Sequence, residues 1–231
     1  MSWFQLDPFN ISSRVQDAKV PSLGASITRG ALGFTLVSIA AFMPWGIFGN
    51  WFKTHGGELA MYIACAVVFL ILSGLLLHKL IIGSGSLPRF YKLFTPAFAL
   101  YSVAWIVAWM TLRGHLGGVV GLLCGCAVMG CMFAAAFGAY RQIVPVIAAL
   151  FVLNALGYFI GGVFETALMG VPECQIGGVT LAKPSQVMLA KMQWGVCYGL
   201  GLGAGLGLAF YLCQSQARTV LAKRTDGSPS P

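Results

Sequence analysis

The sequence predicts an all-α integral membrane protein, a bundle of six transmembrane helices with both termini in the cytoplasm. Three observations lead to this fold class. The 231 residues are 58% hydrophobic and only 9% charged, six charge-free stretches of membrane length follow one another, and Lys and Arg fall unequally on alternate sides of them. A soluble domain carries about 25% charged residues, so most of this surface must face lipid, the first expected partner.

The charged residues mark the ends of the spans, each of which needs about 20 apolar residues to cross a bilayer as a helix. The predicted spans are about 30–52, 59–80, 94–112, 116–138, 143–164 and 192–213. They form one transmembrane domain, 30–213, after a cytoplasmic N-terminal segment, 1–29. The tail, 214–231, ends in TDGSPSP and is expected to be disordered.

Prolines and glycines indicate where the helices bend or stop. Pro44 is expected to kink the first span, whereas Pro96 and Pro145 are expected in the first turns of the third and fifth spans, where a missing N–H costs little. The longest loop, about 166–190, contains Pro172, Gly177-Gly178 and Pro184, which argue against a continuous helix there.

The distribution of Lys and Arg predicts the orientation. Ten lie on the side of the termini and four on the other side, which favours a cytoplasmic location of both ends. The net charge of +8 comes from scattered residues rather than from a dense patch, so we expect no nucleic-acid partner. The compact loops favour a bacterial inner membrane.

Glycine rows predict close helix packing. The chain has 30 glycines, and several recur every fourth residue, which places them on one helix face. Such faces let two helices approach closely in lipid, within the bundle, against other membrane subunits or in self-association. The predicted helix-packing residues are Gly117, Gly121, Gly125, Gly157, Gly161, Gly195, Gly199, Gly203 and Gly207.

Two stripes of side chains predict a pocket or permeation path that opens to the outside. The fifth span carries Asn154, Tyr158 and Glu165 on roughly one face, and the third span carries Tyr101, Trp105 and Trp109 at four-residue spacing. The alternative is that Asn154 bonds a neighbouring helix while the aromatic rings face lipid. No carboxylate lies at the bilayer centre, since Glu58 and Glu165 are interfacial, and this argues against a proton- or sodium-coupled pump.

No motif predicts catalysis, so we expect no enzyme, no catalytic residue, no metal and no cofactor. The sequence has no Gly-rich phosphate loop, zinc-protease helix motif or serine nucleophile elbow. The seven cysteines are expected to act as small apolar side chains. His55 and His115 are both expected in outer loops, where a haem or metal site is an alternative.

Three functional hypotheses follow. The leading one is an accessory or scaffold subunit that packs against other membrane proteins through its glycine-rich faces. The second is a passive channel or transporter for a small uncharged solute, which would use the polar and aromatic stripes. The third is a membrane redox or haem-binding protein.

Overall fold

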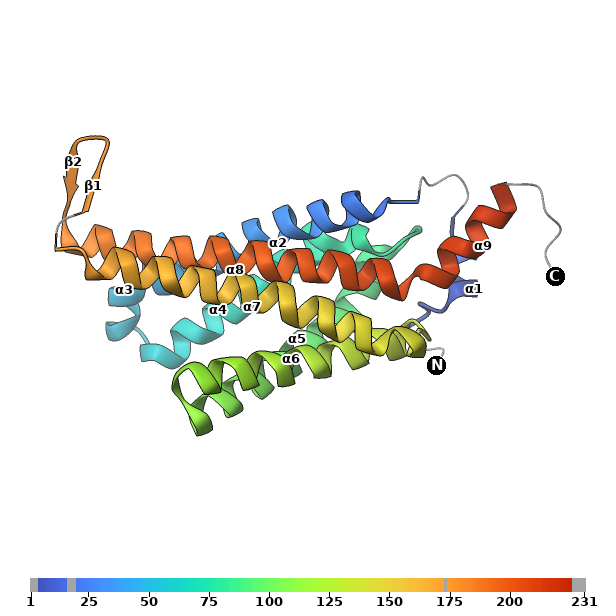
Figure 1. Cartoon of the computed structure of the whole chain (residues 1–231), viewed down its shortest axis with the longest axis horizontal. Helices are drawn as coiled ribbons and strands as arrows, with labels where there is room; N and C mark the ends of the chain where they lie inside the picture. Colours follow the sequence, from blue (N-terminus) through green and yellow to red (C-terminus); the bar gives the residue numbers. More distant parts are fainter. Residues whose placement is uncertain (1–3, 16–19, 173, 226–231) are drawn as a thin grey trace.

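The computed structural model describes residues 4–15, 20–172 and 174–225, and its long helices form a membrane-spanning bundle (Figure 1). Six described helices are long and apolar enough to cross a bilayer, which confirms the predicted all-α six-helix membrane fold. They are α2 (Leu23–Gly46), α4 (Gly57–Leu77), α5 (Ser86–Leu112), α6 (Gly114–Ala136), α7 (Ile143–Gly170) and α8 (Lys183–Cys213).

Short elements connect and flank these helices. A β-hairpin between α7 and α8 was not expected; its strands pair antiparallel with Ile176 opposite Val179, and it projects beyond the bundle (Figure 1). Gly177 and Gly178 form its turn with φ values of 57° and 83°, as a two-residue turn of this hand requires. The short elements are α1 (Pro8–Ser13), α3 (Gly49–Thr54), η1 (His78–Leu80), η2 (Tyr140–Gln142), β1 (Cys174–Ile176), β2 (Val179–Leu181) and α9 (Ser215–Thr225).

The segment predicted as a disordered tail is helical over most of its length, because α9 has a partner to pack on. Ala217 and Leu221 are buried at a spacing of four residues, and α9 lies against α1. Arg224 donates to the carbonyl oxygen of Ser12 at 3.0 Å. The rest of the predicted tail, 226–231, lies outside the described residues. We call the end of the bundle with α1 and α9 the terminal end, and the opposite end the hairpin end.

Several helices extend beyond the apolar windows that predicted them. α8 begins at Lys183 rather than near 192, and α5 begins at Ser86 rather than near 94, because charged side chains near a bilayer surface do not end a helix. Pro96 therefore lies inside α5 and not in its first turn. Pro44 lies inside α2, which continues for two more residues to Gly46.

α8 is the central helix, and glycines bring it into backbone contact with α2 on one side and α7 on the other. A β-carbon added to Gly207 would lie 2.9 Å from Cα of Ile27, and one added to Gly157 would lie 2.9 Å from Cα of Gly201. These spacings leave no room for a side chain. We call this three-helix contact the glycine seam; it contains Gly30, Gly157, Gly201, Gly203 and Gly207.

The α5–α6 hairpin joins the bundle differently. Large side chains of α5 pack on small residues of α6, as where the Tyr101 ring lies against Gly125. At the terminal end, the hairpin is attached to α8 through stacked and tilted rings, including Phe90–Phe210 at 5.8 Å and Phe133–Phe210 at 4.9 Å. Toward the hairpin end, α5 and α6 diverge from the other helices (Figure 1).

Candidate functional site: an aromatic hollow at the hairpin end

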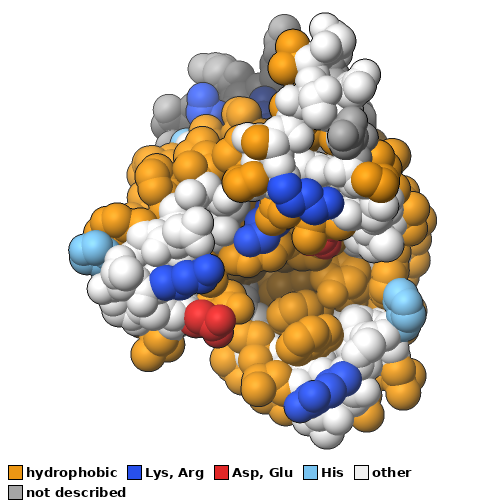
Figure 2. All heavy atoms as spheres, turned by 90° about the vertical axis from the view of Figure 1, so that its left-hand side faces the viewer, with side chains coloured by type: hydrophobic (Ala, Val, Ile, Leu, Met, Phe, Trp, Pro, Cys, Tyr) orange, Lys and Arg blue, Asp and Glu red, His pale blue; other side chains and the backbone are white. Residues whose placement is uncertain are grey.

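The hairpin end of the bundle is hollowed, and its walls are mainly apolar. Figure 2 views the molecule from this end and shows hydrophobic side chains inside the hollow, with Lys and Arg side chains around its mouth. The hollow follows from the divergence of the α5–α6 hairpin from α7 and α8. Toward the terminal end, aromatic side chains of α5, α7 and α8 contact one another across this gap.

An aromatic ladder links α5, α7 and α8; it consists of Trp109, Trp105, Tyr158, Trp194 and Tyr198. Trp105 stacks on Trp109 with 6.0 Å between ring centroids and meets Tyr158 edge-on at 6.2 Å. Tyr158 meets Trp194 at 5.2 Å, and Trp194 stacks on Tyr198 at 5.5 Å. These spacings are those of favourable ring pairs. Since the ladder bridges the diverging helices, we infer that it forms the lower wall of the hollow.

A buried polar cluster lies at the base of the ladder, near the middle of the membrane span. It consists of Asn154, Tyr101, Tyr198 and Cys126, which are 0%, 4%, 7% and 0% exposed. Asn154 donates through Nδ2 to Tyr101 Oη at 2.9 Å and to Cys126 Sγ at 3.7 Å. The Tyr198 hydroxyl donates to the same Tyr101 oxygen at 3.5 Å. Four helices, α5, α6, α7 and α8, therefore meet at uncharged polar groups.

Two polar atoms, one in this cluster and one on the ladder, have unused hydrogen-bonding capacity. Within the described part of the chain, Asn154 Oδ1 and Trp105 Nε1 are buried and have no hydrogen-bond partner. Leaving such a group unpaired costs about 1–3 kcal/mol. Asn154 Oδ1 is an acceptor and Trp105 Nε1 is a donor.

Charged side chains lie nearer the mouth. Glu165 lies two helical turns beyond Tyr158 on α7 and interacts electrostatically with Lys191 of α8. The Lys191 ammonium also lies 4.4 Å from the centre of the Trp45 ring, and donates to the Trp45 carbonyl oxygen at 3.4 Å. A side cavity of about 400 Å³ lies here, between the end of α2 and the start of α8; Trp45, Lys53 and Lys191 are among its lining residues.

The structure brings most residues of the two predicted stripes together. Asn154 contacts Tyr101, and Tyr158 contacts Trp105, which itself stacks on Trp109. Glu165 lies apart from the polar cluster, toward the mouth. Asn154 does bond a neighbouring helix, as in the alternative interpretation, but only one of its two amide atoms is used.

Sequence reasoning missed three members of the site, Trp194, Tyr198 and Cys126. Trp194 and Tyr198 are four residues apart on α8, the same spacing that singled out Trp105 and Trp109 on α5. This spacing could have identified Trp194 and Tyr198 from the sequence. Cys126 carries no such signal, because only the approach of α6 to α7 places its sulfur near Asn154.

The nine glycines predicted to pack helices all lie against other helices of this same chain. Gly117, Gly121 and Gly125 of α6 meet α5, and Gly157 and Gly161 of α7 meet α8. The α8 glycines meet α2: Gly195 lies against Phe42, Gly199 against Thr35, and Gly203 and Gly207 against Gly30 and Ser26. These faces are therefore occupied within the bundle.

His55 lies in the turn after α3, whereas His115 lies in the first turn of α6 rather than in the predicted loop, and both have local partners. His55 stacks on Trp51 at 4.3 Å and makes hydrogen-bond contacts within its own turn, whereas His115 lies beside the Phe159 ring at 6.5 Å. Glu58 lies in the first turn of α4. Among the described residues, no group of three or more His, Cys, Asp or Glu side chains is arranged to hold a metal ion.

Comparison of the chain with protein-family models, with curated proteins and with solved structures finds no match.

Proposed function

We propose that this multi-pass membrane protein is a non-enzymatic passive carrier, which binds a small, uncharged, mainly apolar molecule in the hairpin-end hollow. The observation that carries the proposal is that two buried polar atoms at membrane depth, Asn154 Oδ1 and Nε1 of the ladder residue Trp105, have no hydrogen-bond partner among the described residues. A solute with one hydrogen-bond donor and one acceptor on a flat apolar body would satisfy both atoms.

The charge distribution supports an uncharged solute. The cluster at the base contains an amide, two phenols and a thiol, and the charged groups of this region, such as Glu165 and Lys191, lie near the mouth. An ion entering the base would lose its hydration without meeting a counter-charge, which is costly. An uncharged solute avoids this cost.

The closed terminal end supports a carrier rather than an open pore. A layer of phenylalanine rings packs around α8 between the polar cluster and the terminal end. Its members, each at most 1% exposed, are Phe90, Phe94, Phe133, Phe137 and Phe210. This layer separates the hollow from the terminal end. Passage of solute would require the α5–α6 hairpin to shift on these rings, which gives alternating access. We propose that the terminal end faces the cytoplasm, on the Lys and Arg distribution, and that the membrane is a bacterial inner membrane, on the compact loops.

A role as an accessory subunit is the second candidate, and the projecting β-hairpin favours it. The hairpin extends beyond the bundle, and Val179 is 64% exposed at its turn (Figure 1). Since the nine predicted packing glycines are occupied within the chain, a partner subunit would contact this hairpin or lipid-facing side chains. Purification from the native membrane in mild detergent, followed by native mass spectrometry, would detect a partner in fixed ratio.

The carrier proposal is tested with benzamide, a flat uncharged probe that has one amide donor and acceptor group. We expect the purified protein to bind benzamide in calorimetry, and proteoliposomes to equilibrate a benzamide gradient faster than protein-free liposomes in stopped-flow light scattering. Asn154→Leu should weaken binding about tenfold, because it removes the acceptor.

Ser102→Ala is the matched control, because Ser102 follows Tyr101 on α5 but bonds the Phe98 carbonyl of its own helix. It should bind and transport benzamide as the natural protein does. Equal binding by Asn154→Leu and the natural chain would contradict the site. Binding without accelerated flux would keep the site and reject the carrier.

A further inference from the structure

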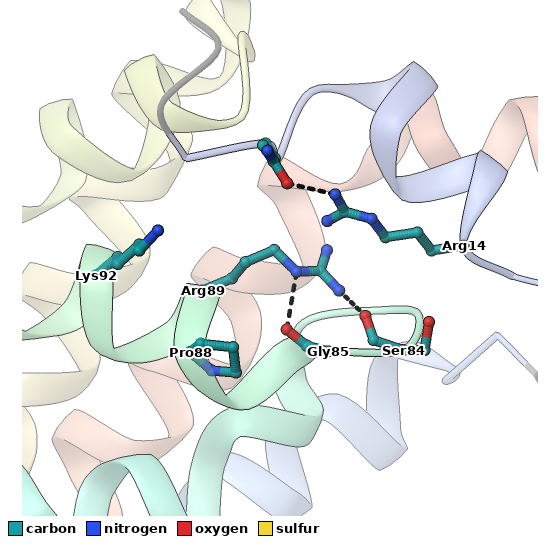
Figure 3. A pocket seen from close by; sticks show the side chains of 7 residues that line it. Arg14, Ser84, Gly85, Pro88, Arg89 and Lys92 are labelled. Carbon is teal, nitrogen blue, oxygen red and sulfur yellow. Dashed lines mark hydrogen bonds between the residues drawn. The ribbon is translucent and has the colours of Figure 1, made fainter.

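A second, chemically different cavity lies at the terminal end, on the outside of the bundle (Figure 3). It has a volume of about 340 Å³ and lies between α1, the loop that precedes α5, and the first turns of α5. Its lining residues are Gln5, Arg14, Ser84, Gly85, Pro88, Arg89 and Lys92. Three of the seven are cations and none is acidic.

Arg89 is the buried centre of this cavity. The residue is only 5% exposed, although it carries a permanent charge. Its Nε donates to the Gly85 carbonyl oxygen at 3.0 Å, and Nη2 donates to the Ser84 carbonyl oxygen. These two bonds fix the guanidinium plane and use one edge of it. The remaining nitrogen, Nη1, is buried and has no partner in the described part of the chain.

Figure 3 shows the Arg89 guanidinium pointing into the space that it shares with Arg14, while Lys92 borders the same space from the next turn of α5. Arg14 is held there because its guanidinium donates to Gln5 Oε1, and its carbonyl oxygen accepts from Ser84 N at 3.4 Å. Two positioned guanidinium groups of like sign repel each other. An anion placed between them would turn this repulsion into attraction.

The backbone around the cavity adds positive potential. Gly85 precedes the first residue of α5 with a φ of 66°, and no side chain caps this helix start. The first turn of α5 and the positive end of its helix dipole therefore lie at the cavity wall, where they favour negative charge. Ser86 does not compete for the site, because its hydroxyl is paired with Nδ1 of His78 at 2.9 Å.

We propose that this cavity binds a phosphate group. A tetrahedral oxyanion can accept from Arg89 Nη1 and from the Arg14 fork at once, a geometry in which guanidinium groups surpass ammonium groups. The cavity lies where α5 emerges from its apolar section, beyond Lys92, at the level of lipid head groups. The phosphate can therefore belong to an anionic lipid or to a soluble phosphate compound. The site is independent of the hollow at the opposite end.

The test measures lipid and phosphate binding to the full chain purified in neutral detergent. Native mass spectrometry after addition of phosphatidylglycerol or phosphatidylcholine reports lipid retention, and thermal unfolding with added inorganic phosphate reports a soluble anion. We expect Arg14→Gln to weaken binding about tenfold, as loss of one charged hydrogen-bond donor implies.

Two further variants distinguish binding in this cavity from nonspecific attraction of anions to the positive charge of the protein. Arg141→Gln removes one exposed cation at the same end, outside the cavity, and should leave binding unchanged. Arg89→Lys keeps the charge but cannot hold two carbonyl oxygens and reach the ligand, so it should lose binding; its elution in size-exclusion chromatography checks the fold.

The two probes distinguish the sources of phosphate. Retention of phosphatidylglycerol that depends on Arg14, without an effect of inorganic phosphate, identifies a lipid site. Stabilisation by inorganic phosphate that depends on Arg14 identifies a site for a soluble compound. Equal behaviour of Arg14→Gln, Arg141→Gln and the natural protein with both probes would overturn the proposal.

Discussion

The glycine seam and the α5–α6 attachment are two different ways of joining helices in one bundle. In the seam, α2, α8 and α7 touch through backbone atoms, as where Gly157 meets Gly201. At the attachment, α5 and α6 reach α8 through whole rings, such as Phe133 on Phe210. Backbone contacts have no rotamers to change, whereas rings can slide and tilt on one another.

This difference bears on the proposed carrier function, which requires the α5–α6 hairpin to move relative to the glycine seam. The hollow lies between the glycine seam and the α5–α6 hairpin, at the end of the bundle where the hairpin diverges (Figure 1). A carrier needs this combination, a fixed frame and one element that moves against it. The proposed function therefore depends on the difference in packing between the glycine seam and the ring attachment.

The largest expected effect is at the ring attachment. Phe210 is 1% exposed and contacts three phenylalanines, Phe90 of α5, Phe133 of α6 and Phe137 directly after α6. Phe210→Ala should lower the free energy of unfolding by about 3 kcal/mol, because it leaves a cavity that lipid cannot fill. Unfolding in detergent by SDS titration measures the change. Phe164→Ala is the control, since Phe164 is 51% exposed on α7, and it should change little.

A smaller effect is expected in the glycine seam, where two identical substitutions on α2 make a matched pair. A β-carbon on Gly30 would lie 2.9 Å from Cα of Gly207, whereas one on Gly24 would meet nothing within 4 Å. Gly30→Ala should therefore destabilise the protein by about 1–3 kcal/mol, because backbone cannot move aside. Gly24→Ala should be neutral or slightly stabilising. Similar melting temperatures for the two variants would refute a rigid seam.

The sequence was sufficient for the spans because hydropathy is a local property, which each 20-residue window carries by itself. It was insufficient for α9, whose helix depends on Ala217 and Leu221 finding α1, more than 200 residues earlier in the chain. The β-hairpin was missed because its strands have three residues each, too few for an alternating pattern.

The candidate site divides in the same way. Asn154 could be identified from sequence because a polar side chain at membrane depth is costly, and Trp105 because it lies deeper than an interfacial tryptophan. Their partners could not be identified, since the hydrogen bond to Tyr101 and the approach of Cys126 join helices that are distant in sequence. The glycines set the distance between helices. The sequence shows the rows of glycines, but it does not indicate which helix packs against each row.

The smallest expected effects on stability lie in the polar cluster, where the hydroxyl oxygen of Tyr101 accepts two hydrogen bonds. Tyr101 accepts from Asn154 at 2.9 Å, whereas the bond from Tyr198 measures 3.5 Å, and the Tyr198 ring is held independently by its stack on Trp194. Tyr198→Phe should therefore cost at most about 0.5 kcal/mol, and Tyr101→Phe about 1 kcal/mol, because the latter also removes the closer acceptor of the Asn154 amide and leaves it only the longer contact with Cys126 Sγ. SDS titration of both variants shows which one loses more unfolding free energy. A reversed order would mean that the Tyr198 hydroxyl, rather than that of Tyr101, organises the base of the hollow, and would move the proposed solute contact from α7 to α8.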